Sequence, residues 1–136
     1  MTAGYSGTPH AKKLGFKAPM TVLTIGAPGD YRDWLEGLER GVDFTARSPR
    51  QVAAAHVFVT REKDLATHAA KLRKLLEPAG FVWISWPKKS SGVATDITED
   101  TIRKVALPMG FVDVKVCAVT DVWSGLKLVI RKSERK

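Results

Sequence analysis

Two lysines, two serines and a glycine directly follow an apolar stretch in the middle of the chain. Residues 81–86 read Phe-Val-Trp-Ile-Ser-Trp and lead through a proline into Lys88, Lys89, Ser90, Ser91 and Gly92. Ammonium groups, hydroxyls and free backbone N–H groups are ligands for phosphate or carboxylate. The loop therefore predicts an anion site, on which Trp86 could stack a ring. The alternative is a solvated basic turn with a packed tryptophan.

A second candidate is the turn Gly26-Ala-Pro-Gly29-Asp30, which follows the apolar residues 20–25 and opens a helix. Helix N-termini attract anions through free N–H groups and the helix dipole. Asp30 in the cap position would supply its own carboxylate, so a tight structural turn is the alternative. Thr60 follows another apolar stretch, 54–59, and completes the set of expected ligand-binding residues.

The sequence offers little for catalysis. His10, His56 and His68 fall in different expected elements, without zinc-site spacing. Ser90 has no neighbouring histidine and no G-x-S-x-G elbow. The single cysteine, Cys117, lies in a valine-rich strand, which indicates a buried, inert thiol. We therefore predict no catalytic residue and no metal.

Apolar runs, glycine stops and capping residues predict the elements that position these groups. Expected helices begin at Thr8-Pro9, at Asp30, at Thr60, and at Asp96 or Thr98, where Asp96 with Glu99 fits a capping box. Expected strands are 20–25, 42–45, 54–59, 81–86, 112–117 and 126–130. Strands separated by helices predict a mostly parallel sheet with helices on both faces, and the last two strands form an antiparallel hairpin. Ligands bind such sheets at the carboxyl ends of the strands.

The length and net charge of the chain limit the classes of protein to which it can belong. The 136 residues predict one α/β domain, 1–136, with residues 1–18 as an N-terminal arm and short helix. A net charge of +8 favours anionic small molecules, acidic proteins or nucleic acid. The start of the chain lacks a signal-peptide pattern, and no apolar run is long enough to cross a membrane. We therefore expect a cytoplasmic protein.

The element order resembles the Rossmann-like fold of the class I methyltransferases, in a truncated form that lacks one strand–helix unit after residues 42–45. Residues 14–26 are similar to the approach to the first strand of that fold. The chain also resembles a family of short bacterial proteins of unknown function, through residues 4–9, 86–92, 95–100 and 113–117 and through Trp123-Ser-Gly125. The resemblance to the methyltransferases implies a three-layer Rossmann-like sandwich of about six strands.

The sequence departs from the methyltransferase pattern at three places. The turn 26–30 lacks the G-x-G-x-G form with a preceding acid, and Pro28 removes an N–H donor. Thr45-Ala-Arg47 stands where the resemblance implies an acid for ribose hydroxyls. Thr60-Arg-Glu-Lys63 stands in place of an Asn/Asp-Pro-Pro-aromatic motif. We therefore predict no cofactor, although the fold would suit S-adenosylmethionine.

The hypothesis that best fits these observations is a non-catalytic binding module with an anion- or nucleotide-like site at the carboxyl edge of the sheet. The alternatives are a divergent S-adenosylmethionine-dependent methyltransferase and a nucleic-acid-binding protein that uses its basic surface. Unpaired sheet edges also predict a homodimer as a further alternative.

Overall fold

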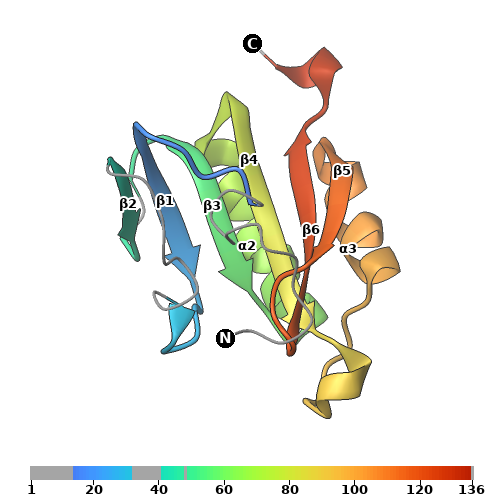
Figure 1. Ribbon diagram of the computed structural model, residues 1–136. Coiled ribbons are helices and arrows are strands. Elements are labelled where there is room, and N and C mark those ends of the chain that lie inside the picture. The colour runs from blue at the N-terminus through green and yellow to red at the C-terminus, as the bar shows by residue number, and fades with distance from the viewer. Residues whose placement is uncertain (1–13, 32–40, 48, 136) are drawn as a thin grey trace.

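A six-stranded mixed sheet forms the centre of the computed structural model, which describes residues 14–31, 41–47 and 49–135 (Figure 1). The strands are β1 (Met20–Ile25), β2 (Val42–Thr45), β3 (Val52–Phe58), β4 (Leu76–Pro87), β5 (Phe111–Ala118) and β6 (Trp123–Ile130). All six overlap the strands expected from the sequence, but β3 is shifted by one or two residues, β4 begins five residues earlier than its apolar stretch, and β6 begins at Trp123, which was expected in the turn. The helices expected from Thr8-Pro9 and from Asp30 fall largely outside the described residues.

The strand order is β2-β1-β3-β4-β6-β5. The first four strands are parallel, whereas β6 is antiparallel to both β4 and β5. The predicted mostly parallel sheet with a final antiparallel hairpin is therefore confirmed. Parallel strands that follow each other in the chain normally need a helical crossover, yet β2 leads to β3, on the other side of β1, through residues 46–51 alone. This short arch accounts for the missing strand–helix unit.

Both described α-helices cover the same face of the sheet (Figure 1). They are α2 (Glu62–Leu75) and α3 (Glu99–Ala106), and the apolar sides of both pack on the sheet. Leu65 and Leu72 of α2 and Ile102 of α3 are fully buried. The 3₁₀ turn η3 (Leu107–Met109) extends α3 and ends at Gly110, whose φ of 100° is the left-handed conformation that favours glycine.

Residues 14–19 cross the opposite face of the sheet in front of β3 and β4 (Figure 1). Leu14 and Phe16 are buried there with Val22, Phe81 and Trp83 in a second core. The Trp83 indole N–H donates to the Leu14 carbonyl at 2.7 Å. This bond attaches the segment to the sheet through a fully buried side chain.

Candidate functional site

All ten residues expected to bind a ligand lie at or just beyond the carboxyl ends of β1, β3 and β4, the lower edge of the sheet in Figure 1. Gly26, Gly29 and Asp30 follow β1, and Thr60 follows β3. Residues 88–92 follow β4, and three of them form the 3₁₀ turn η2 (Lys89–Ser91). The sheet therefore brings the predicted segments to one edge, because its first four strands are parallel.

The centre of this edge is the gap between β1 and β3. The chain passes from β1 to β2 on one side and returns to β3 on the other, so the strand order reverses here. Open α/β sheets bind ligands at such a switch point. Gly26 occupies it with a φ of 70°, and a Cβ atom there would lie 2.8 Å from the Phe58 carbonyl oxygen. The strand ends thus approach closely, and only glycine fits.

The lysine–serine loop uses part of its hydrogen-bonding capacity on itself. The Ser91 hydroxyl donates to the Lys88 carbonyl at 2.6 Å and accepts from the Val93 N–H at 3.1 Å. The Gly92 N–H donates to the Lys89 carbonyl. Ser91 and Gly92 were expected to bind the anion, but here they hold the turn. The side-chain polar atoms of Lys88, Lys89 and Ser90 make no hydrogen bond or ion pair with another described residue.

The loop is fixed to the sheet at both ends. At its start the Lys88 N–H donates to the Val122 carbonyl at 2.7 Å, in the turn between β5 and β6. At its end the Thr95 hydroxyl donates to the Thr60 carbonyl at 2.7 Å, and the Asp96 N–H donates to the same oxygen at 3.2 Å. Lys89 and Ser90 are therefore presented to solvent from a fixed turn.

The N-terminus of α2 is capped from a distant part of the chain. Thr60 was expected to cap this helix, but Arg61 holds the cap position and makes no side-chain capping bond. The Asp96 carboxylate instead accepts the Glu62 N–H at 2.7 Å. The expected Asp96–Glu99 capping box is wrong as well, because the alternative cap, Thr98, exchanges hydrogen bonds with Thr101 at the start of α3. The Asp96 carboxylate therefore already occupies the N-terminus of α2, the end of the helix that attracts anions.

Removing this carboxylate should destabilise the protein measurably. We expect Asp96→Ala to lower the free energy of unfolding by about 1–2 kcal/mol, the usual effect of losing an N-cap. Asp96→Asn keeps the acceptor oxygen and should cost less. Urea denaturation of the two variants checks this, with Asp121→Ala, an exposed acid in another turn, as the control. Equal stability of Asp96→Ala and the parent would contradict the capping role.

Of the two described tryptophans at this edge, Trp86 faces the helices and Trp123 the opposite side. Trp86 is only 7 % exposed and packs in the core beneath α2 and α3, so it has no open face on which a ligand ring could stack. Trp123 pairs with Pro87 at the end of β4, is half-buried, and contacts Phe58 edge-on at a centroid distance of 5.0 Å. The sequence left open whether Trp86 stacks a ligand ring or packs, because strand alternation cannot tell which face will be covered, and in the structure Trp86 packs.

A buried chain of polar side chains lies behind the switch point. The Tyr31 hydroxyl is 3.0 Å from Nδ1 of His56, and Nε2 of His56 is 2.7 Å from the Ser85 hydroxyl. His56 and Ser85 are fully buried, and Tyr31 is 4 % exposed. Burial lowers the pKa of His56 to about 3 and raises the pKa of the Tyr31 phenol. The histidine is therefore neutral, and the chain attaches the turn after β1 to β3 and β4.

The serine–histidine pair resembles a nucleophile and its base in distance alone. Both side chains have no exposed surface, so a substrate carbonyl cannot reach the Ser85 oxygen. No sequence spacing indicates this pair, because Ser85 and His56 lie on neighbouring strands and are brought together only by the register His56↔Trp83 and Phe58↔Ser85. We assign the pair a structural role.

A cation follows β2 where the resemblance implied an acid. The Thr45 hydroxyl accepts the Arg47 N–H at 3.1 Å, which holds the turn after β2. Arg47 is exposed and makes no ion pair with a described residue. Because Leu23 of β1 pairs with Thr45 of β2, this turn lies next to the exit of β1. The edge thus carries positive charge at both sides, from Arg47 and from the lysines after β4.

Two further findings concern the described part of the chain. No group of three or more histidine, cysteine or acidic side chains there is arranged to hold a metal ion. Among the same residues, no helix has the length and apolar character needed to cross a membrane.

Comparison with solved structures establishes the fold. A SAM-dependent methyltransferase from Aquifex aeolicus matches with a TM-score of 0.66 at 15% identity, over 88% of this chain and 87% of that one. A putative type 11 methyltransferase from Sulfolobus solfataricus matches with a TM-score of 0.65 at 16% identity, over 93% and 92%. The Methanococcus jannaschii fibrillarin pre-rRNA processing protein matches with a TM-score of 0.54 at 15% identity, over 98% and 72%. No family model and no curated protein matches the sequence.

The protein therefore has a methyltransferase-like α/β fold of the Rossmann type, as the sequence predicted. The first two of these neighbours are matched over nearly their whole length, so the similarity extends across the sheet rather than to one motif. At these identities the likeness concerns the fold.

Proposed function

We propose that the protein binds a phosphate-bearing, nucleotide-like small molecule at the carboxyl edge of the sheet and does not transform it. The observation that carries this proposal is the switch point at Gly26, flanked by the uncompensated cation Arg47. Related dinucleotide-binding folds use an acid after the second strand for ribose hydroxyls, whereas an arginine near that place accommodates a phosphate. The charge at this position favours phosphate.

The remaining groups at the edge support the same ligand class. Lys89 and Ser90 extend from the fixed turn η2, and half-buried Trp123 supplies an aromatic surface against Phe58. The N-terminus of α2 is already occupied by Asp96, so the phosphate is expected nearer to Gly26 and Arg47. The non-catalytic part of the proposal rests on the seclusion of Ser85 and His56, which leaves them no access to a ligand.

Thermal unfolding in the presence of ADP, ATP, adenosine and S-adenosylhomocysteine tests the proposal. A ligand at 100 times its dissociation constant stabilises the folded state by about 2.7 kcal/mol. We expect stabilisation by the phosphorylated nucleotides and little by adenosine. The absence of stabilisation by any nucleotide at millimolar concentration would contradict the proposal.

The arch between β2 and β3 provides a matched pair of variants. Arg47 lies at its carboxyl-edge end, whereas Arg50 lies at the opposite end, before β3. We expect Arg47→Ala to weaken ADP binding about tenfold, equivalent to about 1.4 kcal/mol for a lost charge-assisted contact. Arg50→Ala removes the same charge and should leave binding within about twofold of the parent. Isothermal titration calorimetry checks both, and equal losses would indicate only a general charge effect.

The second candidate is a divergent methyltransferase, which is favoured by the methyltransferases among the structural neighbours. It predicts tight calorimetric binding of S-adenosylhomocysteine that does not depend on Arg47. S-adenosylhomocysteine binding without nucleotide binding would establish this candidate in place of the first. Nucleotide binding without S-adenosylhomocysteine binding would exclude the methyltransferase.

A further inference from the structure

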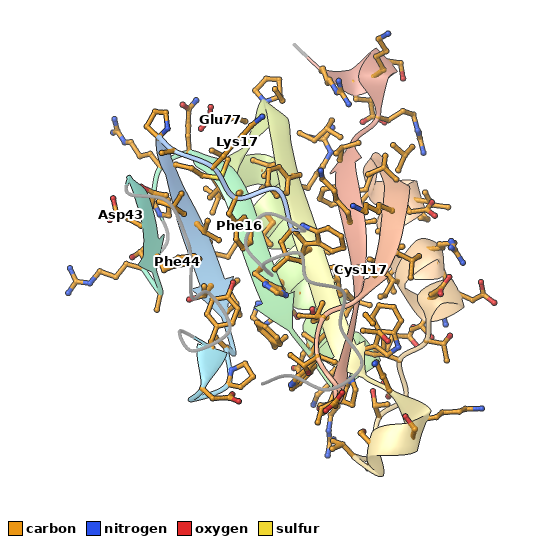
Figure 2. The ribbon with its side chains drawn as sticks, in the orientation of Figure 1. Phe16, Lys17, Asp43, Phe44, Glu77 and Cys117 are labelled. Carbon is orange, nitrogen blue, oxygen red and sulfur yellow. The ribbon has the colours of Figure 1, made fainter. Side chains whose placement is uncertain are left out.

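Three lysines lie on the face of the sheet opposite α2 and α3. Lys115 of β5 and Lys127 of β6 are directly opposite each other in the antiparallel ladder, so their side chains extend from the same face. Lys17 belongs to the segment 14–19, which crosses that face, and Figure 2 shows it beyond Phe16 on this segment. These residues, Lys17, Lys115 and Lys127, are called the lysine cluster.

The lysine cluster makes no ion pair with a described carboxylate. Like charges directly opposite each other on an antiparallel pair are destabilising. No described carboxylate lies within ion-pair distance of the three ammonium groups, whereas four other described cations, Arg73, Arg103, Lys104 and Arg131, each have an acid at that distance. Burial lowers the pKa of Lys127, and the charges of Lys115 and Lys17 lower it further. The arrangement thus costs stability that an external anion would restore.

Lys127 is held in a defined position. Its ammonium group lies 4.5 Å from the centroid of the Phe81 ring, a cation–π distance. The Phe81 ring is itself stacked against Phe16, with centroids 6.1 Å apart and planes 17° apart. Gly15 follows Leu14, which is fixed by the Trp83 hydrogen bond, and a Cβ atom at Gly15 would lie 3.8 Å from the Lys127 nitrogen. The cation is therefore partly immobilised before any ligand arrives, which lowers the entropy cost of binding.

We propose that the lysine cluster is a second anion site, which binds the phosphate groups of a ligand distinct from that of the carboxyl edge. Lysines bind phosphate as point charges, and neighbouring lysines can contact successive phosphates. The site lies on strands β5 and β6 and on the segment 14–19, so it does not share residues with the switch point. The phosphate groups belong either to a small polyphosphate or to the backbone of a nucleic acid.

Side-chain NMR of the lysine ammonium groups tests this proposal directly. We expect millimolar pyrophosphate, or a single-stranded oligothymidylate, to shift the Lys115 and Lys127 signals and to raise the pKa of Lys127. The double variant Lys115→Gln/Lys127→Met removes two charges and keeps the apolar stem over Phe81, so it should fold at least as stably as the parent. We expect it to bind at least tenfold more weakly, about 1.4 kcal/mol.

The matched control is Lys71→Gln/Lys74→Gln on α2, which removes two positive charges from the other face. Binding within about twofold of the parent in this control, together with the loss in the cluster variant, supports the proposal. A response to pyrophosphate alone assigns a small ligand, and a response to the oligonucleotide alone assigns a nucleic-acid backbone. Unmoved lysine signals with both probes, or equal losses in both double variants, would overturn the second site.

Discussion

Acidification from neutral pH to about pH 4 is expected to destabilise this protein strongly through His56. The folded state holds the histidine neutral, with a pKa of about 3 against 6.5 for an exposed histidine, because burial disfavours the charged form. Between these two values the unfolded chain binds a proton that the folded chain does not. The unfolding equilibrium constant therefore rises by up to about tenfold for each pH unit below 6.5.

The measurement is the free energy of unfolding in urea at a series of pH values. His56→Gln keeps a polar side chain but removes the titrating group, so it should flatten the dependence on pH between about 6.5 and 4. The variant should also be less stable at neutral pH by about 2–4 kcal/mol, because Tyr31 and Ser85 lose their fixed partner in the core. A comparison at each pH separates the two effects.

His68→Gln is the matched control, since His68 lies half-buried on α2 and outside the polar chain. We expect the pH dependence of this variant to match that of the parent. If His56→Gln kept the full pH dependence, other groups would be responsible for acid unfolding. The conclusion that His56 is neutral in the folded state would then be wrong.

The second large effect is expected at Trp83, which connects the N-terminal segment to the sheet. Trp83 has no exposed surface, and its indole N–H donates to the Leu14 carbonyl at 2.7 Å. Trp83→Ala would leave a large cavity in the second core and should cost about 3–5 kcal/mol. Trp83→Phe retains an aromatic ring but leaves the buried Leu14 carbonyl without its donor. We expect this loss to lower the free energy of unfolding by about 1–3 kcal/mol.

Trp123→Phe provides a comparison at the carboxyl edge, where the indole is half-buried. We expect it to cost less than Trp83→Phe, because less of its surface is removed from water. Chemical denaturation followed by far-UV circular dichroism checks all three variants, since the loss of a tryptophan would alter a fluorescence signal. A Trp83→Phe variant as stable as the Trp123→Phe variant would contradict the role of the Leu14 bond.

The positions of the strands were predictable from local sequence. The runs 20–25 and 42–45 coincide with β1 and β2 because glycine or polar residues end each apolar stretch. The order of strands and helices predicted a parallel sheet, and its parallel direction brought Gly26, Thr60 and residues 88–92 to one edge. Periodicity and turn chemistry are local properties, so one sequence is enough to read them.

Capping partners were only partly predictable. Thr98 sits within one turn of the residue it bonds and was recognised as an alternative cap. Asp96 caps a helix that begins 34 positions earlier in the chain, a contact to which no sequence spacing points. The same reason explains why the packing of Trp86 was left open: the burial of this side chain depends on which face of the sheet the helices cover.

The sequence by itself determined the Rossmann-like fold, the basic loop after β4 and the cation at the end of β2, because each depends on neighbouring residues or on element order. The tertiary structure alone decided which groups in the lysine–serine loop are available, since Ser91 and Gly92 hold the turn while Lys89 and Ser90 face solvent. It also assembled the buried histidine chain and the lysine cluster. The members of each lie on different elements and meet only through strand register, the turn after β1 and the path of the segment 14–19.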